Sequence, residues 1–133
     1  MTTPRSTTLS HTTPEALHAA IEHAFRRGDI DSYLALHRTD ATVVAPPDGR
    51  AAHGLDAIRE AVEPILALHP RLTSTVIGKV EGDGLALTHA RWELVGTDAD
   101  GVPFEQRGRG TIVSRQEPDG TGRIALDNPM TPE

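Results

Sequence analysis

The stretch that decides the fold is LTSTVIGKVEGDGLALTHARWELVGTDADGVPFEQRGRGTIVSRQEPDGTGRIALD, residues 72–127. Its β-rich runs cover residues 72–80, 85–95, 104–115 and 122–127. Turns rich in glycine and aspartate separate these runs, at residues 82–84, 98–101 and 118–120. Because turns of this kind connect neighbouring antiparallel strands, the stretch predicts a four-stranded antiparallel meander.

The residues before this stretch predict helices. Thr13-Pro14 is a helix start signal, because threonine caps a free N–H and proline fits the first helical position. Apolar residues at helical spacing follow between residues 17 and 25. Gly28 ends this helix, and Asp29 caps a second, short helix.

A short strand and a third helix complete the pattern. Residues 41–45 (ATVVA) predict the strand, and an apolar stripe between residues 54 and 66 predicts the helix. Pro64 lies inside this stripe, so we expect a kink or a break near Glu63. Helices followed by strands indicate an α+β fold, with the helices packed on one face of a curled sheet.

Length and composition narrow the class of protein. The chain has 133 residues, a net charge of -6, no cysteine and 3% aromatic residues. We expect a disordered lead-in at 1–12, one domain at 13–128 and a tail at 129–133. The negative net charge argues against nucleic-acid binding, which needs clustered basic residues. No apolar stretch approaches the roughly 20 residues that a membrane-spanning helix needs. Because the N-terminus resembles no signal peptide, we expect a cytoplasmic protein.

Alternation along the second run separates an inner face from an outer face. The inner set, predicted to face the core, is Ala86, Thr88, Ala90, Trp92 and Leu94. The outer set, predicted to face solvent or a partner subunit, is His89, Arg91 and Glu93. Gly108-Arg109-Gly110 lies inside a strand run, so it does not predict a phosphate-binding loop, which precedes a helix.

Several of these segments together resemble the NTF2-like superfamily, in its SnoaL-like and ketosteroid isomerase-like branch. They are Gly28-Asp29-Ile30-Asp31, Leu34-Ala35-Leu36, Asp40-Ala41-Thr42-Val43, Gly54 with Ala57-Ile58-Arg59-Glu60, Trp92-Glu93-Leu94, Asp100-Gly101, and Gly120 with Arg123-Ile124. The resemblance covers residues 14–127. It implies a cone of curled antiparallel sheet wrapped around three helices, an internal pocket, and a homodimer formed through the outer sheet face. The superfamily includes isomerases, cyclases, dehydratases and non-catalytic members, so the fold does not decide the function.

The three polar groups of the ketosteroid isomerases are absent. By this resemblance their general base falls on Ala45, their tyrosine on Ile21 and their second carboxylic acid near Thr111. None of these side chains can abstract a proton from carbon. We therefore do not expect steroid isomerisation by the Asp/Tyr mechanism.

Two other residues are the candidates for catalysis. Asp127 is similar in place to an acid/base residue of the polyketide cyclase relatives, and His37 replaces an aromatic residue near the pocket floor. Together they predict a proton-handling pair. The alternatives are a packed histidine at a helix C-terminus and an aspartate that begins a turn with Asn128-Pro129.

The remaining pocket candidates would bind a small, largely apolar ligand. The predicted ligand-binding residues are Trp92, Tyr33, Thr88, Ile21, Ala45, Val62 and Thr111. Trp92 is either a core wedge or a platform for the ligand. Histidine spacing predicts no metal site, and we expect no cofactor.

We expect an acid/base enzyme of the isomerase, cyclase or dehydratase type that acts on a small carbonyl compound. The alternative is a non-catalytic ligand-binding or dimerisation module.

Overall fold

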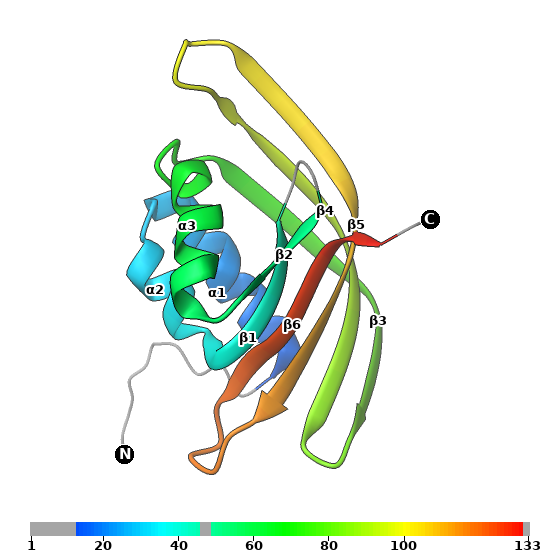
Figure 1. Cartoon of the computed structure of the whole chain (residues 1–133). Helices are drawn as coiled ribbons and strands as arrows, with labels where there is room; N and C mark the ends of the chain where they lie inside the picture. Colours follow the sequence, from blue (N-terminus) through cyan, green and yellow to red (C-terminus); the bar gives the residue numbers. More distant parts are fainter. Residues whose placement is uncertain (1–12, 46–48, 132–133) are drawn as a thin grey trace, which may run out of the picture.

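Three helices and a six-stranded sheet make up the part of the chain that the computed structural model describes, residues 13–45 and 49–131 (Figure 1). In chain order the elements are α1 (Pro14–Arg27), α2 (Ile30–Ala35), β1 (His37–Ala45), β2 (Arg50–His53), α3 (Leu55–Leu66), β3 (Arg71–Gly82), β4 (Leu85–Thr97), β5 (Pro103–Gln116) and β6 (Gly122–Thr131). The predicted lead-in at 1–12 lies outside the described residues. None of the described helices is long and apolar enough to cross a bilayer.

The predicted helix boundaries of α1 and α2 are confirmed. The Thr13 hydroxyl accepts a hydrogen bond of 3.1 Å from the Ala16 N–H, and Pro14 opens α1. Gly28 ends α1 in the left-handed region at φ 64°, where a side chain would meet the ring of His69 at 2.7 Å. The Asp29 carboxylate then caps α2 through the Ser32 N–H at 3.1 Å. Local capping chemistry therefore sets the turn between these helices.

Helix α3 begins after Gly54, as predicted, but continues through Pro64 to Leu66. Of the two outcomes expected at Pro64, the break near Glu63 is wrong, whereas the kink stays a prediction. Pro64 lies in the last turn, so the missing N–H removes a single hydrogen bond near the end of the helix. The buried side chains of Ile58, Val62 and Leu66 belong to the hydrophobic core, so α3 packs against the core up to its last turn.

The sheet has the strand order β2-β1-β6-β5-β4-β3. Strands β3 to β6 form the predicted antiparallel meander. Two features differ from the sequence analysis. Strand β2 was not predicted, and β1 begins at His37 and runs parallel to β6, so the sheet is mixed. Parallel pairing between segments so distant in sequence leaves no local signal.

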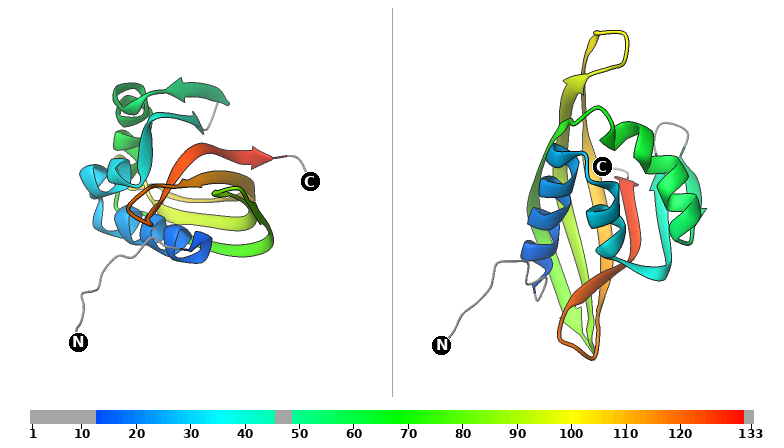
Figure 2. Two further views of the ribbon diagram at one scale, coloured as in Figure 1. Left: turned by 90° about the horizontal axis from the view of Figure 1, so that it is seen from below. Right: turned by 90° about the vertical axis from the view of Figure 1, so that its left-hand side faces the viewer.

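All three helices lie on the concave face of the curled sheet, which stays open (Figures 1 and 2). Helix α1 packs against β3, and α3 packs against β1 and β2. The most deeply buried apolar side chains include Leu17, Ile58, Leu66 and Ile124, which join helices and sheet in one core. The α+β cone expected from the sequence is therefore the observed fold.

Strand β6 continues four residues past Asp127, through Asn128-Pro129, to Thr131. The interpretation of Asn128-Pro129 as a turn is therefore wrong. The register between β5 and β6 shifts between Thr111 and Arg109. Pro129 is tolerated there because the regular hydrogen-bond ladder is interrupted, so no N–H is required at its position.

Candidate functional site

A cavity of about 110 Å³ lies between the helices and the concave face of the sheet. Most of its wall is apolar, and this part of the wall includes Ile21, Val43, Val62, Leu72, Ala90 and Ile112. The polar side chains at its surface are His18, Tyr33, Ser74, Trp92, Gln106 and Asp127. An apolar hollow with a few polar groups is typical of a small-molecule site.

Asp127 is the one carboxylic acid among the residues that line this cavity. The residue lies on β6, opposite Val43 of β1 and Ile112 of β5, and both neighbours are apolar. Burial raises the pKa of Asp127 from 3.8 to about 7, because the ionised carboxylate is poorly solvated there. Both protonation states are therefore populated near neutral pH, as proton transfer requires.

Tyr33 lines the same cavity from α2 and is buried. Its ring makes an edge contact with Phe25, with ring centroids 5.7 Å apart. Burial raises the pKa of Tyr33 well above its usual value, and the charge of Asp127 raises it further. The phenol therefore keeps its proton and remains a hydrogen-bond donor in the neighbourhood of Asp127.

His37 is buried but is not among the residues that line the cavity. Its Nδ1 donates a hydrogen bond of 2.8 Å to the Tyr33 carbonyl oxygen, and its Nε2 has no partner. Burial lowers the pKa of His37 to about 4, so the ring is neutral near pH 7. The hydrogen-bonded pair that we expected between His37 and Asp127 is not formed.

The register of the parallel strands explains this separation. His37 lies opposite Ile124 of β6, three residues before Asp127. The packed histidine at a helix C-terminus, which was the alternative interpretation, describes its environment.

Trp92 faces the cavity, as its position on the inner face predicts. Its indole Nε1 donates a hydrogen bond of 2.8 Å to the Pro129 carbonyl oxygen. A Cβ on Gly108, which pairs with Trp92 across β4 and β5, would lie 2.9 Å from the indole. A Cβ on Gly110 would lie 3.0 Å from the backbone of Pro129. The two glycines of the Gly108-Arg109-Gly110 segment therefore make room for the indole and for the end of β6.

The other predicted ligand-binding residues divide into two groups. Ile21, Ala45 and Val62 line the cavity. Thr88 faces inward, but its hydroxyl is held by His18 and it is not part of the lining. Thr111 lies on the outer face, where its hydroxyl is 3.0 Å from Nδ1 of His89. The prediction that Thr111 lines the pocket was therefore wrong. An error of one residue in the strand register is enough, because neighbouring side chains on a strand point to opposite faces.

The sequence analysis missed His18 and Ser74. His18 is buried on α1, with Nε2 2.8 Å from the Thr88 hydroxyl and Nδ1 3.4 Å from the Ser74 hydroxyl. The available signal was a histidine between Leu17 and Ile21 on the buried face of α1. Within the described part of the chain, no group of three or more histidine, aspartate or glutamate residues could hold a metal ion.

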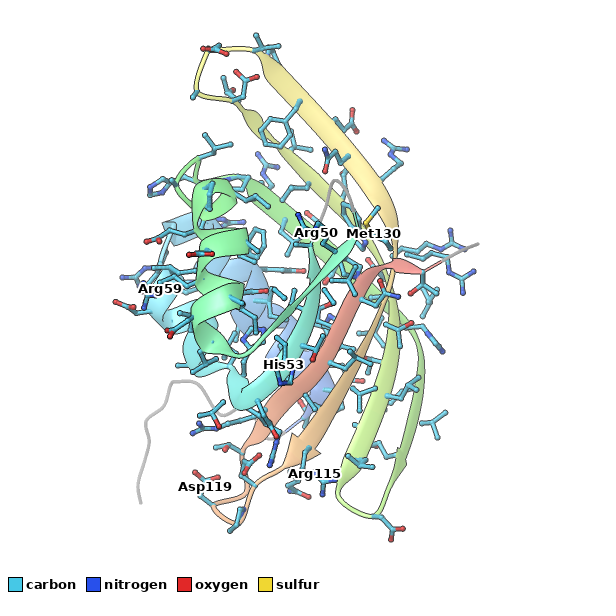
Figure 3. All side chains as sticks on the ribbon, in the orientation of Figure 1. Arg50, His53, Arg59, Arg115, Asp119 and Met130 are labelled. Atoms are coloured by element: carbon cyan, nitrogen blue, oxygen red, sulfur yellow. The ribbon has the colours of Figure 1, made fainter. Side chains whose placement is uncertain are left out.

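Several charged side chains lie outside the cavity. Arg59 lies on the outer side of α3 (Figure 3), where it forms an ion pair of 2.8 Å with Asp31. Arg115 and Asp119 lie by the β5–β6 hairpin (Figure 3). These residues do not contribute to the lining of the cavity.

Solved structures with the same fold come from several bacteria. A ketosteroid isomerase-like protein from Erwinia carotovora atroseptica SCRI1043 aligns with a TM-score of 0.74 and 23% identity, over 89% of this chain and 94% of that protein. An NTF2-like superfamily protein from Salmonella enterica serovar Typhimurium LT2 aligns with a TM-score of 0.73 and 15% identity, over 88% and 87% of the two chains. At these identities the likeness shows the fold alone.

A third similar structure is a putative calcium/calmodulin-dependent protein kinase type II association domain from Thiobacillus denitrificans. It aligns with a TM-score of 0.72 and 18% identity, over 93% of this chain and 100% of that one. No curated protein matches the chain with significance. The family model described as the SnoaL-like domain matches residues 17–125. This match shows that the chain belongs to the SnoaL-like domain family, and the solved structures share its open six-stranded fold.

Proposed function

We propose that this protein is a cofactor-independent acid/base enzyme that moves a proton on a small, largely apolar carbonyl compound. Its reaction would be of the isomerase, cyclase or dehydratase type. The observation that carries the proposal is Asp127, a carboxylic acid in an apolar cavity with its pKa raised to about 7. Perturbed acids in cavities are frequent at catalytic sites.

Asp127 and Tyr33 have complementary roles in this mechanism. The Asp127 carboxylate accepts a proton from the carbon next to the ligand carbonyl, and the C–H electron pair moves toward the carbonyl oxygen. The Tyr33 phenol donates a hydrogen bond to that oxygen as its negative charge develops. The carboxylic acid then returns the proton to a carbon or an oxygen of the ligand, which restores the enzyme.

The volume of the cavity limits the ligand. A dry protein cavity of roughly 150 Å³ accommodates benzene, and the cavity here measures about 110 Å³. A ligand held inside it therefore has at most about one small ring. This size, together with the apolar wall, supports a monocyclic or short-chain carbonyl compound over a steroid.

Hydrogen exchange tests the proposal without knowledge of the natural ligand. In D₂O, wild-type protein is expected to accelerate exchange of the α-hydrogens of cyclopentanone, with a rate that rises as the pH passes about 7. A Tyr33→Phe variant should retain binding but lose about tenfold to a hundredfold of the exchange rate, since it cannot donate to the oxygen. The exchange is followed by proton NMR.

The control is Ser32→Ala, a neighbouring substitution on the exposed side of α2. The proposal fails if wild-type protein binds cyclopentanone and related small ketones without accelerating exchange. That outcome would support the second candidate function, a non-catalytic ligand-binding module. The apolar Ile21 and Ala45, which occupy the positions of two isomerase groups by resemblance, favour this alternative.

We also propose that the protein forms a homodimer through the outer face of the sheet. Four apolar residues form one row across that face, in cross-strand register from β3 to β6: Val80, Leu87, Val113 and Leu126. Val80 is 69% exposed and Leu126 41% exposed. A contiguous apolar row across an exposed sheet face is typical of a protein interface.

A second copy of the chain suits this face, because acidic and basic residues alternate beyond the row. Arg107 already bonds Glu93 and Glu105 on the same face, so one copy can offer either charge to its partner. Light scattering is expected to give twice the mass of the chain, and Leu87→Asp is expected to give a monomer that still folds. A monomeric wild-type protein at about 100 μM would contradict this proposal.

A further inference from the structure

The cavity has a second polar end, formed by His18 of α1 and Ser74 of β3. The Thr88 hydroxyl holds Nε2 of His18 at 2.8 Å. The backbone N–H of Ser74 donates a hydrogen bond of 2.7 Å to the Glu22 carboxylate, one helical turn after His18. Both groups are therefore fixed in place before any ligand binds.

The contact between these two groups is long. Nδ1 of His18 lies 3.4 Å from the Ser74 hydroxyl oxygen, at the outer limit for a hydrogen bond. Burial lowers the pKa of His18, so the ring is neutral near pH 7 and Nδ1 either donates or accepts. The Thr88 hydroxyl matches either tautomer: it can accept from Nε2 while its own proton points to the Ile112 carbonyl oxygen at 3.5 Å, or it can donate to Nε2. An oxygen atom of a ligand would bond better to Nδ1 and to the Ser74 hydroxyl than these groups bond to each other.

The strand register places Thr88, which holds the His18 ring at this polar end, two strands from Asp127. Thr88, Ile112 and Asp127 are paired side by side on β4, β5 and β6. Neighbouring strands lie about 4.8 Å apart, so the backbones of Thr88 and Asp127 are separated by roughly 10 Å. The apolar side chain of Ile112 lies between them on the cavity floor. His18, Ser74 and Asp127 line the same cavity, so both polar ends are open to one apolar hollow.

We propose that His18 and Ser74 bind a second oxygen atom of the ligand, so that the preferred ligands are small hydroxyketones rather than simple ketones. The carbonyl group lies at the Tyr33 and Asp127 end, and the hydroxyl group lies at the His18 and Ser74 end. This placement of the carbonyl rests on the proposed function, whereas the preference for a second oxygen can be measured by binding alone.

Two matched probes test the preference, 4-hydroxycyclohexanone and cyclohexanone, which differ by one hydroxyl group. Dissociation constants are measured by NMR titration of ¹⁵N-labelled full-length protein. Wild-type protein is expected to bind the hydroxyketone about fivefold to tenfold more tightly, as one well-formed hydrogen bond provides. Ser74→Ala and His18→Phe are each expected to reduce this ratio toward one and to leave cyclohexanone binding within about twofold of wild type.

His23→Gln is the matched control, because His23 is a histidine on the same helix whose side chain is exposed and does not line the cavity. It should keep the wild-type ratio. The inference is overturned if Ser74→Ala and a folded His18→Phe keep that ratio, or if both probes weaken equally in the variants. A failure of the proposed function would give a different result. The protein would still bind the hydroxyketone more tightly than cyclohexanone, but it would not accelerate α-hydrogen exchange.

Discussion

Replacing Asp127 with asparagine is expected to abolish α-hydrogen exchange and, at about pH 8, to make the protein more stable. The amide cannot accept a proton from carbon, so we expect a loss of about a thousandfold in exchange rate, within the range that a positioned acid/base group contributes. The gain in stability arises because the ionised carboxylate is costly in an apolar cavity, whereas the amide is uncharged. An active-site group that lowers stability is a known compromise between activity and folding.

The sign of the stability effect follows from the pKa. The pKa of Asp127 is about 7 in the folded protein and 3.8 by reference, so the folded state holds its proton more tightly. The free energy of unfolding therefore falls as the pH rises from about 4 to about 7. A pKa change of this size corresponds to at most about 4 kcal/mol, at about 1.4 kcal/mol for each tenfold change in proton affinity. Asp127→Asn removes this loss.

Urea unfolding at about pH 4.5 and about pH 8 measures the effect. The gain from Asp127→Asn should be large at the higher pH and small at the lower one. Asp83→Asn is the matched control, because Asp83 is exposed in the β3–β4 turn at φ 53°, a conformation that asparagine also adopts. A variant of Asp127 that is less stable than wild type at both pH values would contradict the assignment of a buried, costly carboxylate.

Replacing His37 with leucine is expected to change the pH dependence of stability in the opposite direction. The pKa of His37 is about 4 in the folded protein and 6.5 by reference, so the unfolded chain binds the proton more tightly. Stability is therefore lost as the pH falls from about 6.5 to about 4. His37→Leu removes that loss. The change that it causes in the free energy of unfolding should therefore be about 2–3 kcal/mol more favourable at about pH 4.5 than at about pH 7.5.

At neutral pH the same variant loses the hydrogen bond to the Tyr33 carbonyl oxygen but also removes the buried, unpartnered Nε2. These effects oppose each other, at about 1 kcal/mol each. His23→Gln, at an exposed position of α1, serves as the control and should leave the pH profile unchanged. Because His37 lies outside the cavity lining, α-hydrogen exchange should survive. A hundredfold loss of exchange in a folded His37→Leu protein would restore the paired mechanism.

The predictions from sequence succeeded where the determinants are local. Thr13, Gly28 and Asp29 define helix ends through caps that act within a few residues. Alternation along β4 places Trp92 correctly in the cavity, because side chains on a strand have a strict period of two. Asp127 also lies in the cavity, at the place that the family resemblance implied.

The predictions failed where distant segments set the arrangement. His37 was paired with Asp127, but the parallel β1–β6 register places it three residues away, opposite Ile124. Thr111 was assigned to the pocket, and an error of one residue was enough to move it to the outer face. His18 and Ser74 are separated by 56 positions in the chain, so no local pattern brings them together.

Asp127 is, in this mechanism, a cavity-lining acid that gains and loses its proton near neutral pH. The most direct test is a ¹³C NMR titration of the side-chain carboxyl carbon of Asp127, assigned by comparison with Asp127→Asn. We expect a midpoint near 7, because the carboxyl group is buried among apolar side chains. A midpoint near 4, the value of a solvated aspartate, would contradict it.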